Sequence, residues 1–193
     1  MHFDLIGGYG SETCNRLVEA IEIYVGREKQ RIESKRHQLL TSLSHSHGDR
    51  KINMLVDDRK QDLEDVEELA FELAIIALYK HIETKTKRAA LVAFPDLSQE
   101  SVMRMRAPKL EETLREGGVS IREIEHFEDF NELRLINNSL KHSGVVSDEL
   151  AKHAGWEAGQ RLSNLASTYK RVAPLCVLYL SGLMARLREK IVQ

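Results

Sequence analysis

Apolar residues recur at helical spacing through the first third of the chain. After a flexible start over residues 1–10, the spacing of Leu17, Ile21 and Tyr24 continues to about Leu43. The composition of residues 44–49, rich in Ser, His, Gly and Asp, is typical of a turn. The pattern therefore predicts one long N-terminal helix within residues 11–46.

A second helical pattern runs from about Asp57 to Phe94, where Pro95 stops it. Its first half is acidic and its last turns are basic, an arrangement that suits the helix dipole. Residues 73–78 are apolar on every side, which indicates burial on several sides. This helix is the predicted spine of the fold.

The rest of the chain predicts shorter helices separated by Gly, Pro and Ser. They cover about Ser98 to Pro108, Pro108–Glu116, about His126–His142, Ser147–Ala154, and a final helix from Asn164 or Pro174 to Ile191. Together the patterns predict a single all-α domain over residues 1–193. Its architecture is one helical bundle of two long helices, two medium helices and several short ones.

Composition supports the all-α prediction and narrows the class of protein. The chain has only 3 prolines in 193 residues, well below the usual value of about 5%. A β-sandwich or an α/β sheet would need more turn residues and more Val, Ile and Thr runs. The net charge of −2 excludes a generally basic nucleic-acid coat protein, although a local basic site is compatible with it.

Cysteine usage and hydropathy predict a cytoplasmic location. Cys14 and Cys176 lie far apart and outside any CxxC motif, which favours a reduced, intracellular protein. The start of the chain has no pattern of a signal peptide. The most apolar stretch, Val172–Leu187, is interrupted by Pro174 and Arg186 and is too short to span a membrane.

Candidate chemistry concentrates between residues 132 and 144. On a helical wheel, Leu133, Ile136, Leu140 and Phe130 form a core stripe. Arg134, Asn138 and His142 follow at i, i+4 and i+8 on a polar ridge, with Leu135 at its far edge and Asn137 near the core boundary.

A cation, an amide and an imidazole on one ridge can perform phosphodiester chemistry. The His can act as a general acid or base, and the Arg can stabilise the charge that develops on a five-coordinate phosphorus. The alternative is an ordinary solvated helix face, because Arg and Asn are common there and His-Ser-Gly is a common helix end.

The segment Leu133–Gly144 resembles the signature helix of the HEPN superfamily, the higher eukaryote and prokaryote nucleotide-binding domains. The resemblance implies a small, usually dimeric all-α bundle, and in many members a metal-independent endoribonuclease of toxin–antitoxin or phage-defence systems. It implies catalytic roles for Arg134, Asn138 and His142, with Asn137 and Lys141 binding substrate. It also implies RNA as substrate, a homodimer, and a cognate antitoxin or other protein partner.

The segment departs from the family motif in one respect. The family places four to six residues between its Arg and His, whereas seven separate Arg134 from His142. Asn137 occupies the position five before the His, where the family Arg would lie. Two alternatives to an enzyme therefore stay open: a non-catalytic module that binds a nucleotide or a protein, and a dimeric helical scaffold.

Other polar clusters have simpler interpretations. His45 and His47 could bind a metal ion but lack a full ligand set, so a solvated turn is the simpler interpretation, and we expect neither a metal nor another cofactor. His81 could contact phosphate together with nearby cations, or could belong to a solvated helix end. The cations in question are Lys80, Lys85 and Arg88.

Overall fold

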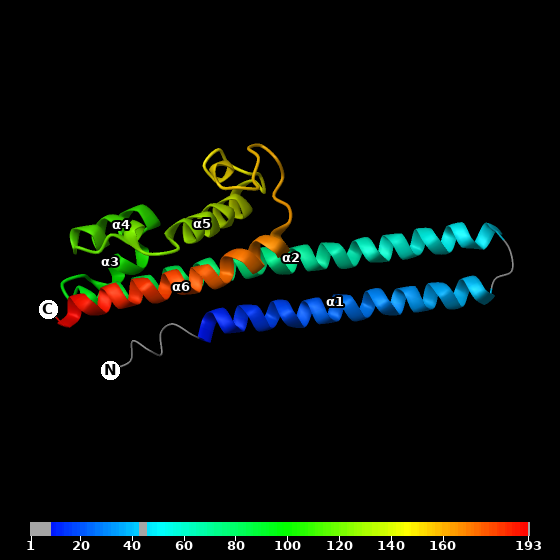
Figure 1. Cartoon of the computed structure of the whole chain (residues 1–193), viewed down its shortest axis with the longest axis horizontal. Coiled ribbons are helices and arrows are strands. Elements are labelled where there is room, and N and C mark those ends of the chain that lie inside the picture. The colour runs from blue at the N-terminus through cyan, green and yellow to red at the C-terminus, as the bar shows by residue number, and fades with distance from the viewer. Residues whose placement is uncertain (1–8, 43–45, 193) are drawn as a thin grey trace. The chain divides into compact units, whose positions relative to one another are not determined.

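The computed structural model describes residues 9–42 and 46–192, and its regular elements in these ranges are helices (Figure 1). The α-helices are α1 (Tyr9–Ser42), α2 (Ser46–Ala93), α3 (Gln99–Arg104), α4 (Ala107–Glu116), α5 (Phe127–His142) and α6 (Leu165–Val192). Two single turns of 3-10 helix are η1 (Ile121–Glu123) and η2 (Leu150–Lys152). The prediction of an all-α fold is confirmed.

The contacts within the chain form two compact units. One unit, Asn15–Ala74, is an antiparallel hairpin of α1 and the first part of α2. Among the described residues, the other unit contains residues 75–192 together with residues 9–14. The expectation of a single domain over residues 1–193 stays a prediction.

Most helix boundaries agree with the sequence pattern, including those around Pro108. Ser98 caps α3 by accepting a hydrogen bond from the Ser101 amide at 3.2 Å, and Pro108 lies in the first turn of α4. The amide of Val119 bonds the Leu114 carbonyl at 2.8 Å, with Gly118 at φ +78°, so the predicted glycine pair does end α4.

The turn predicted at residues 44–49 is wrong in its described part, because α2 begins at Ser46 rather than near Asp57. The helix continues through this polar segment because Ile52 and the buried Val56 lie one turn apart and face α1. Residues 43–45, and residues 1–8 of the predicted flexible start, lie outside the described ranges; Tyr9 and Gly10 already belong to α1.

Two predictions in the last third are corrected. The helix predicted over Ser147–Ala154 is only the single turn η2, although Ser147 Oγ does accept the predicted cap bond from Leu150 at 3.2 Å. The backbone leaves the helical region at His153, which is extended (φ −84°, ψ 142°), and Gly155 at φ +91° turns it further. Of the two starts allowed for the last helix, the earlier one is right: α6 begins at Leu165 and contains Pro174.

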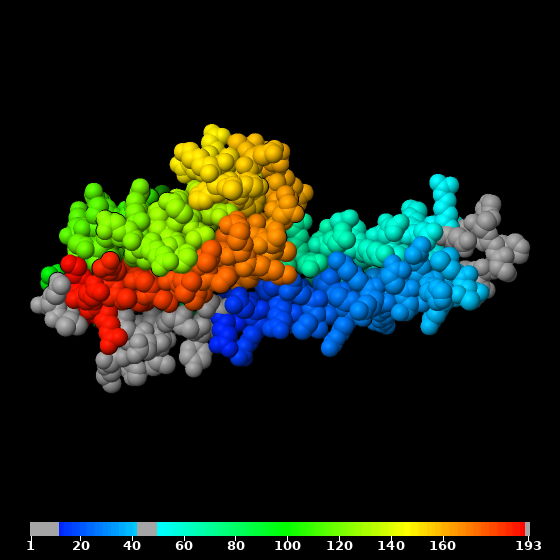
Figure 2. Space-filling view, in the orientation of Figure 1, coloured from blue at the N-terminus to red at the C-terminus, as the bar shows by residue number. Residues whose placement is uncertain are grey.

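Helices α5 and α6 pack together in the core of the larger unit. Leu133 and Ile136 of α5 and Val172 and Leu183 of α6 are all fully buried. The segment between the two helices, residues 143–164, forms a compact lobe beside α5, yellow to light orange in Figure 2. An isolated bridge between Val145 and Arg161 closes the base of this lobe.

Candidate functional site

Burial covers most of the circumference of α5. The predicted core stripe is buried at Leu133 and Ile136, and half-buried at Leu140 and Phe130. Glu132, Leu135 and Ser139, on a neighbouring side, are also buried, because α5 contacts η2 as well as α6. Leu135, expected at the exposed edge of the polar ridge, is only 5% exposed, so that expectation is wrong.

One arc of the helix remains open to solvent, and it carries the predicted ridge. Asn138, Lys141 and His142 are exposed and Arg134 is half-buried. At 100 degrees per residue, these four side chains span about 100 degrees around the axis of α5. We call these four residues the α5 strip. The exposed arc thus collects two permanent cations, an amide and an imidazole.

Contacts within α5 orient the Arg134 side chain. Its Nε and Nη2 donate to Asn131 Oδ1 at 3.2 and 2.8 Å. Within the described part of the chain, no carboxylate forms an ion pair with Arg134, Lys141 or His142. No carboxylate therefore competes with an anion for the N–H donors of these three side chains.

Aromatic rings hold α5 against α2 and α6 beside the strip. Phe130 stacks on Tyr179 with ring centroids 4.5 Å apart, and on Tyr79 with centroids 6.1 Å apart. Lys141 Nζ lies 5.8 Å from the centre of the Tyr79 ring. Burial and the Glu83 carboxylate raise the pKa of the Tyr79 hydroxyl, while Arg134 opposes the rise. Tyr79 is therefore a neutral neighbour of the strip.

Asn137, predicted to bind substrate, lies beneath the strip. Its side chain is 1% exposed, its Nδ2 is 3.5 Å from Asn138 Oδ1, and its Oδ1 is buried without a partner. Lys141, also predicted to bind substrate, is exposed. The position where the family motif has its Arg therefore faces the interior of this unit.

The opposite side of α5 carries a buried ion pair that the sequence pattern did not reveal. Glu132 is 3% exposed and accepts two bonds from the Arg171 guanidinium, at 2.6 and 2.9 Å. It also accepts a bond from Trp156 Nε1 at 2.8 Å. Burial would raise the pKa of Glu132, but the bonds from Arg171 and Trp156 outweigh it and hold the pKa below its usual range.

This cluster ties the 143–164 lobe and α6 to α5. Arg171 comes from α6 and Trp156 from the lobe, 39 and 24 residues from Glu132. The lobe begins immediately after His142, so the cluster fixes the chain that follows the strip. No local spacing could have found it, because the three residues are brought together only by the fold.

One of the three cations predicted beside His81 is engaged in an ion pair: Lys80 donates to Glu83 at 3.1 Å. Lys87, which was not part of that prediction, donates to the same carboxylate at 2.8 Å. His81 itself is half-buried, and burial together with Lys85 lowers the pKa of its imidazole.

The part of the chain that the structure describes contains no group of three His, Cys, Asp or Glu residues placed to hold a metal ion. The predictions for His45 and His47 fall outside what the structure describes. No described helix is both long enough and apolar enough to cross a membrane.

Comparison with family models, with curated proteins and with solved structures found no match to this chain. The α5 strip therefore has to be interpreted from its own chemistry and from the local resemblance of residues 133–144.

Proposed function

We propose that this chain is a HEPN-like, metal-independent endoribonuclease whose active centre is the α5 strip. The observation that carries the proposal is the composition of the exposed arc of α5, where Arg134, Asn138, Lys141 and His142 lie together without carboxylate partners. An RNA phosphodiester is the substrate that this set of groups suits best.

The proposed reaction uses the 2′-hydroxyl of RNA as the nucleophile. His142 removes the proton from this hydroxyl, and the 2′-oxygen attacks the adjacent phosphorus. Arg134 and Lys141 neutralise the charge that develops on the phosphoryl oxygens. The 5′-oxygen of the next nucleotide leaves with a proton from an imidazolium, and the products are a 2′,3′-cyclic phosphate and a 5′-hydroxyl end. By the resemblance, two strips meet in a homodimer and supply two imidazoles.

The direct test is cleavage of a labelled single-stranded RNA in the presence of EDTA. His142→Ala and Arg134→Ala should each slow cleavage by about a hundredfold, the usual scale for losing such a group. Arg104→Ala removes an exposed cation that pairs with Glu100 outside the strip, and it should leave the rate unchanged. The same strand with 2′-O-methyl groups should stay intact, because it lacks the nucleophile.

One observation favours a second candidate, a non-catalytic module that binds RNA or nucleotide. The family Arg position is occupied by the buried Asn137, and seven residues separate Arg134 from His142. Binding of the labelled RNA that Arg134→Ala weakens, without cleavage by the wild type, would support this module and exclude the enzyme.

The proposed cellular role is that of a toxin or defence ribonuclease in the cytoplasm, held inactive by a partner protein. Expression of the wild type should then arrest growth. His142→Ala should relieve the arrest at equal protein level, and Arg104→Ala should not. Arrest that persists with His142→Ala would contradict a ribonuclease toxin acting through this residue.

A further inference from the structure

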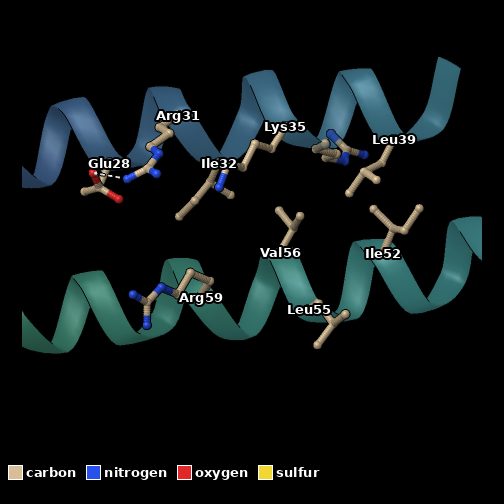
Figure 3. A pocket seen from close by; sticks show the side chains of 10 residues that line it. Glu28, Arg31, Ile32, Lys35, Leu39, Ile52, Leu55, Val56 and Arg59 are labelled. Atoms are coloured by element: carbon tan, nitrogen blue, oxygen red, sulfur yellow. Dashed lines mark hydrogen bonds and ion pairs between the residues drawn. The ribbon is translucent and has the colours of Figure 1, made fainter. Parts of the chain in front are cut away.

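The hairpin of residues 15–74 contains a groove of about 420 Å³ between α1 and α2, which we call the tip groove. Figure 3 shows Ile32 and Leu39 of α1 pointing toward Ile52 and Val56 of α2 across it. Val56 is buried, but Leu39 is 48% exposed and Leu55, which also lines the groove, is 69% exposed. The two helices therefore leave part of this aliphatic surface uncovered.

Unpaired positive charge lies along the α1 edge of the tip groove. Arg31 and Lys35 lie one turn apart on this edge, and Glu28 is the only carboxylate among the lining residues. Arg31 pairs with Glu28 at 3.4 Å, but an exposed pair of this kind contributes little and exchanges readily for another carboxylate. Within the described part of the chain, no carboxylate pairs with Lys35.

The other two cations that line the groove already have partners. Arg36 donates to Asn53 Oδ1 at 3.0 Å and to Glu33 at 3.4 Å. Arg59 pairs with Asp62 at 3.3 Å. The groove thus combines an aliphatic floor with one cationic edge.

The charge of the whole hairpin reinforces this edge. The tip half, residues 28–41 and 50–60, holds eight Lys or Arg against four Asp or Glu, a net charge of +4. The base half, residues 15–27 and 61–74, holds two Lys or Arg against eight Asp or Glu, a net charge of −6. An acidic partner is therefore repelled from the base half and attracted to the tip half.

The shape and the floor of the groove favour a protein helix over RNA. Its apolar lining residues are all Ile, Leu or Val, whereas single-stranded RNA binds by stacking its bases on aromatic rings. From Glu28 to Leu39 the groove follows α1 for about 16 Å, which equals about three turns of helix. A groove between two packed helices accepts a third helix along its length.

We propose that the tip groove binds an acidic amphipathic helix of a partner protein. Leu or Ile side chains at positions i, i+3 and i+7 of the bound helix pack on the aliphatic floor. Asp or Glu side chains along one flank of that helix pair with Arg31 and Lys35. No lining residue belongs to the α5 strip, so this proposal depends neither on RNA cleavage nor on the α5 homodimer.

Fluorescence anisotropy of a labelled helical peptide with the full chain tests the proposal. The probe is a synthetic peptide of about 18 residues with Leu at i, i+3 and i+7 and Glu along one flank. It should bind the wild type with a Kd of roughly 1–100 μM at low salt, and added salt should weaken it. The same peptide with Lys in place of each Glu should bind at least about tenfold more weakly.

The floor is tested by removing its exposed apolar side chains. Leu39→Gln with Leu55→Gln should weaken binding of the acidic peptide by about tenfold or more, because two apolar contacts are lost. Ile23→Gln with Met54→Gln is the matched control, since these side chains, 48% and 66% exposed, do not line the groove.

The cationic edge is tested by reversing its charge. Arg31→Glu with Lys35→Glu should also weaken binding by about tenfold or more. Arg27→Glu with Arg50→Glu is the matched control, because it changes the charge of the hairpin equally at exposed positions outside the groove. All the substituted side chains are exposed, so circular dichroism should show unchanged helix content in every variant.

Several outcomes would overturn the proposal. One is a wild type that does not bind the acidic peptide at about 1 mM, or binds it no better than the Lys peptide. Another is binding that both groove variants retain. A wild-type dimer that Leu39→Gln with Leu55→Gln dissociates would show that the occupant is a second copy of this chain. Binding of labelled RNA that Arg31→Glu with Lys35→Glu abolishes, without binding of the peptide, would assign the groove to nucleic acid.

Discussion

Removal of the Glu132 carboxylate should destabilise the larger unit more than any exposed substitution on α5. Glu132→Ala deletes three hydrogen bonds, two of them in a bidentate pair with Arg171. It leaves the guanidinium and the Trp156 indole without their acceptor. The carboxylate is 3% exposed, so water does not replace the bonds in the folded state.

The expected loss is about 2–3 kcal/mol of unfolding free energy. Breaking a buried ion pair by removing one partner costs roughly 3–5 kcal/mol. The lower figure applies because the Arg171 side chain is 48% exposed and can regain water when its partner is lost. The indole of Trp156, which is half-buried, can also regain water.

Urea unfolding followed by tryptophan fluorescence and by circular dichroism measures the effect. Trp156 is the only tryptophan, so fluorescence reports on the lobe directly. Glu128→Ala is the matched control, because Glu128 is an exposed carboxylate on the first turn of the same helix. Its loss should cost under about 1 kcal/mol, the scale of a helix-dipole interaction.

A Glu132→Ala variant as stable as Glu128→Ala, with unchanged Trp156 fluorescence, would refute the reasoning. It would mean that apolar packing alone holds residues 143–164 against α5. A loss well above 5 kcal/mol would contradict it in the other direction, because the exposed side of Arg171 would then have provided no relief.

Acid should abolish the same contribution. The pKa of Glu132 is lower in the folded chain than in the unfolded chain, so its stabilisation is present above the ordinary carboxyl pKa and is lost as pH falls through the folded value. The stability difference between wild type and Glu132→Gln should therefore shrink below about pH 4. A difference that stays constant from pH 7 to pH 3 would contradict the assigned pKa direction.

Three further predictions concern single positions. Gly117→Ala should lower the unfolding free energy by about 1 kcal/mol or more, because its Cβ would overlap the ring of Phe94. Gly26→Ala, on the open face of α1, should raise the unfolding free energy by about 0.5–1 kcal/mol. Urea unfolding of each variant measures both changes. Asn137→Leu should be neutral or stabilising by up to about 1 kcal/mol, because it removes a buried oxygen that has no partner. If Asn137→Leu abolishes RNA cleavage while remaining folded, the amide has a role that its burial does not explain.

The regular helices could be predicted because local signals determine them. Ser98, Pro108 and the glycine pair at 117–118 give caps and stops that act within a few residues. Where tertiary packing decides, the sequence pattern failed. The early start of α2 accompanies Ile52 and Val56 facing α1, and η2 ends where the backbone becomes extended at His153.

The candidate site was predictable to a similar degree. Helical spacing correctly placed Arg134, Asn138 and His142 on one side of α5, because a helix fixes which residues share a face. Spacing could not show that Leu135 is covered, since its cover comes from outside the helix. The Glu132 cluster was missed for the same reason: its partners are distant in sequence.

The two polar sides of α5 differ in whether their charged side chains form ion pairs. Glu132 and Arg171 satisfy each other, so their charges hold the lobe and α6 in place and have little capacity for a ligand. Arg134, Lys141 and His142 have no such partners among the described residues, and they share the solvent-facing arc. The buried Glu132 carboxylate holds α6 and the 143–164 lobe against α5. The cations on the other side of α5 are therefore held at fixed positions without a carboxylate partner. This difference in ion pairing, rather than the spacing of the motif, is the physical argument for the proposal that the α5 strip binds a phosphate.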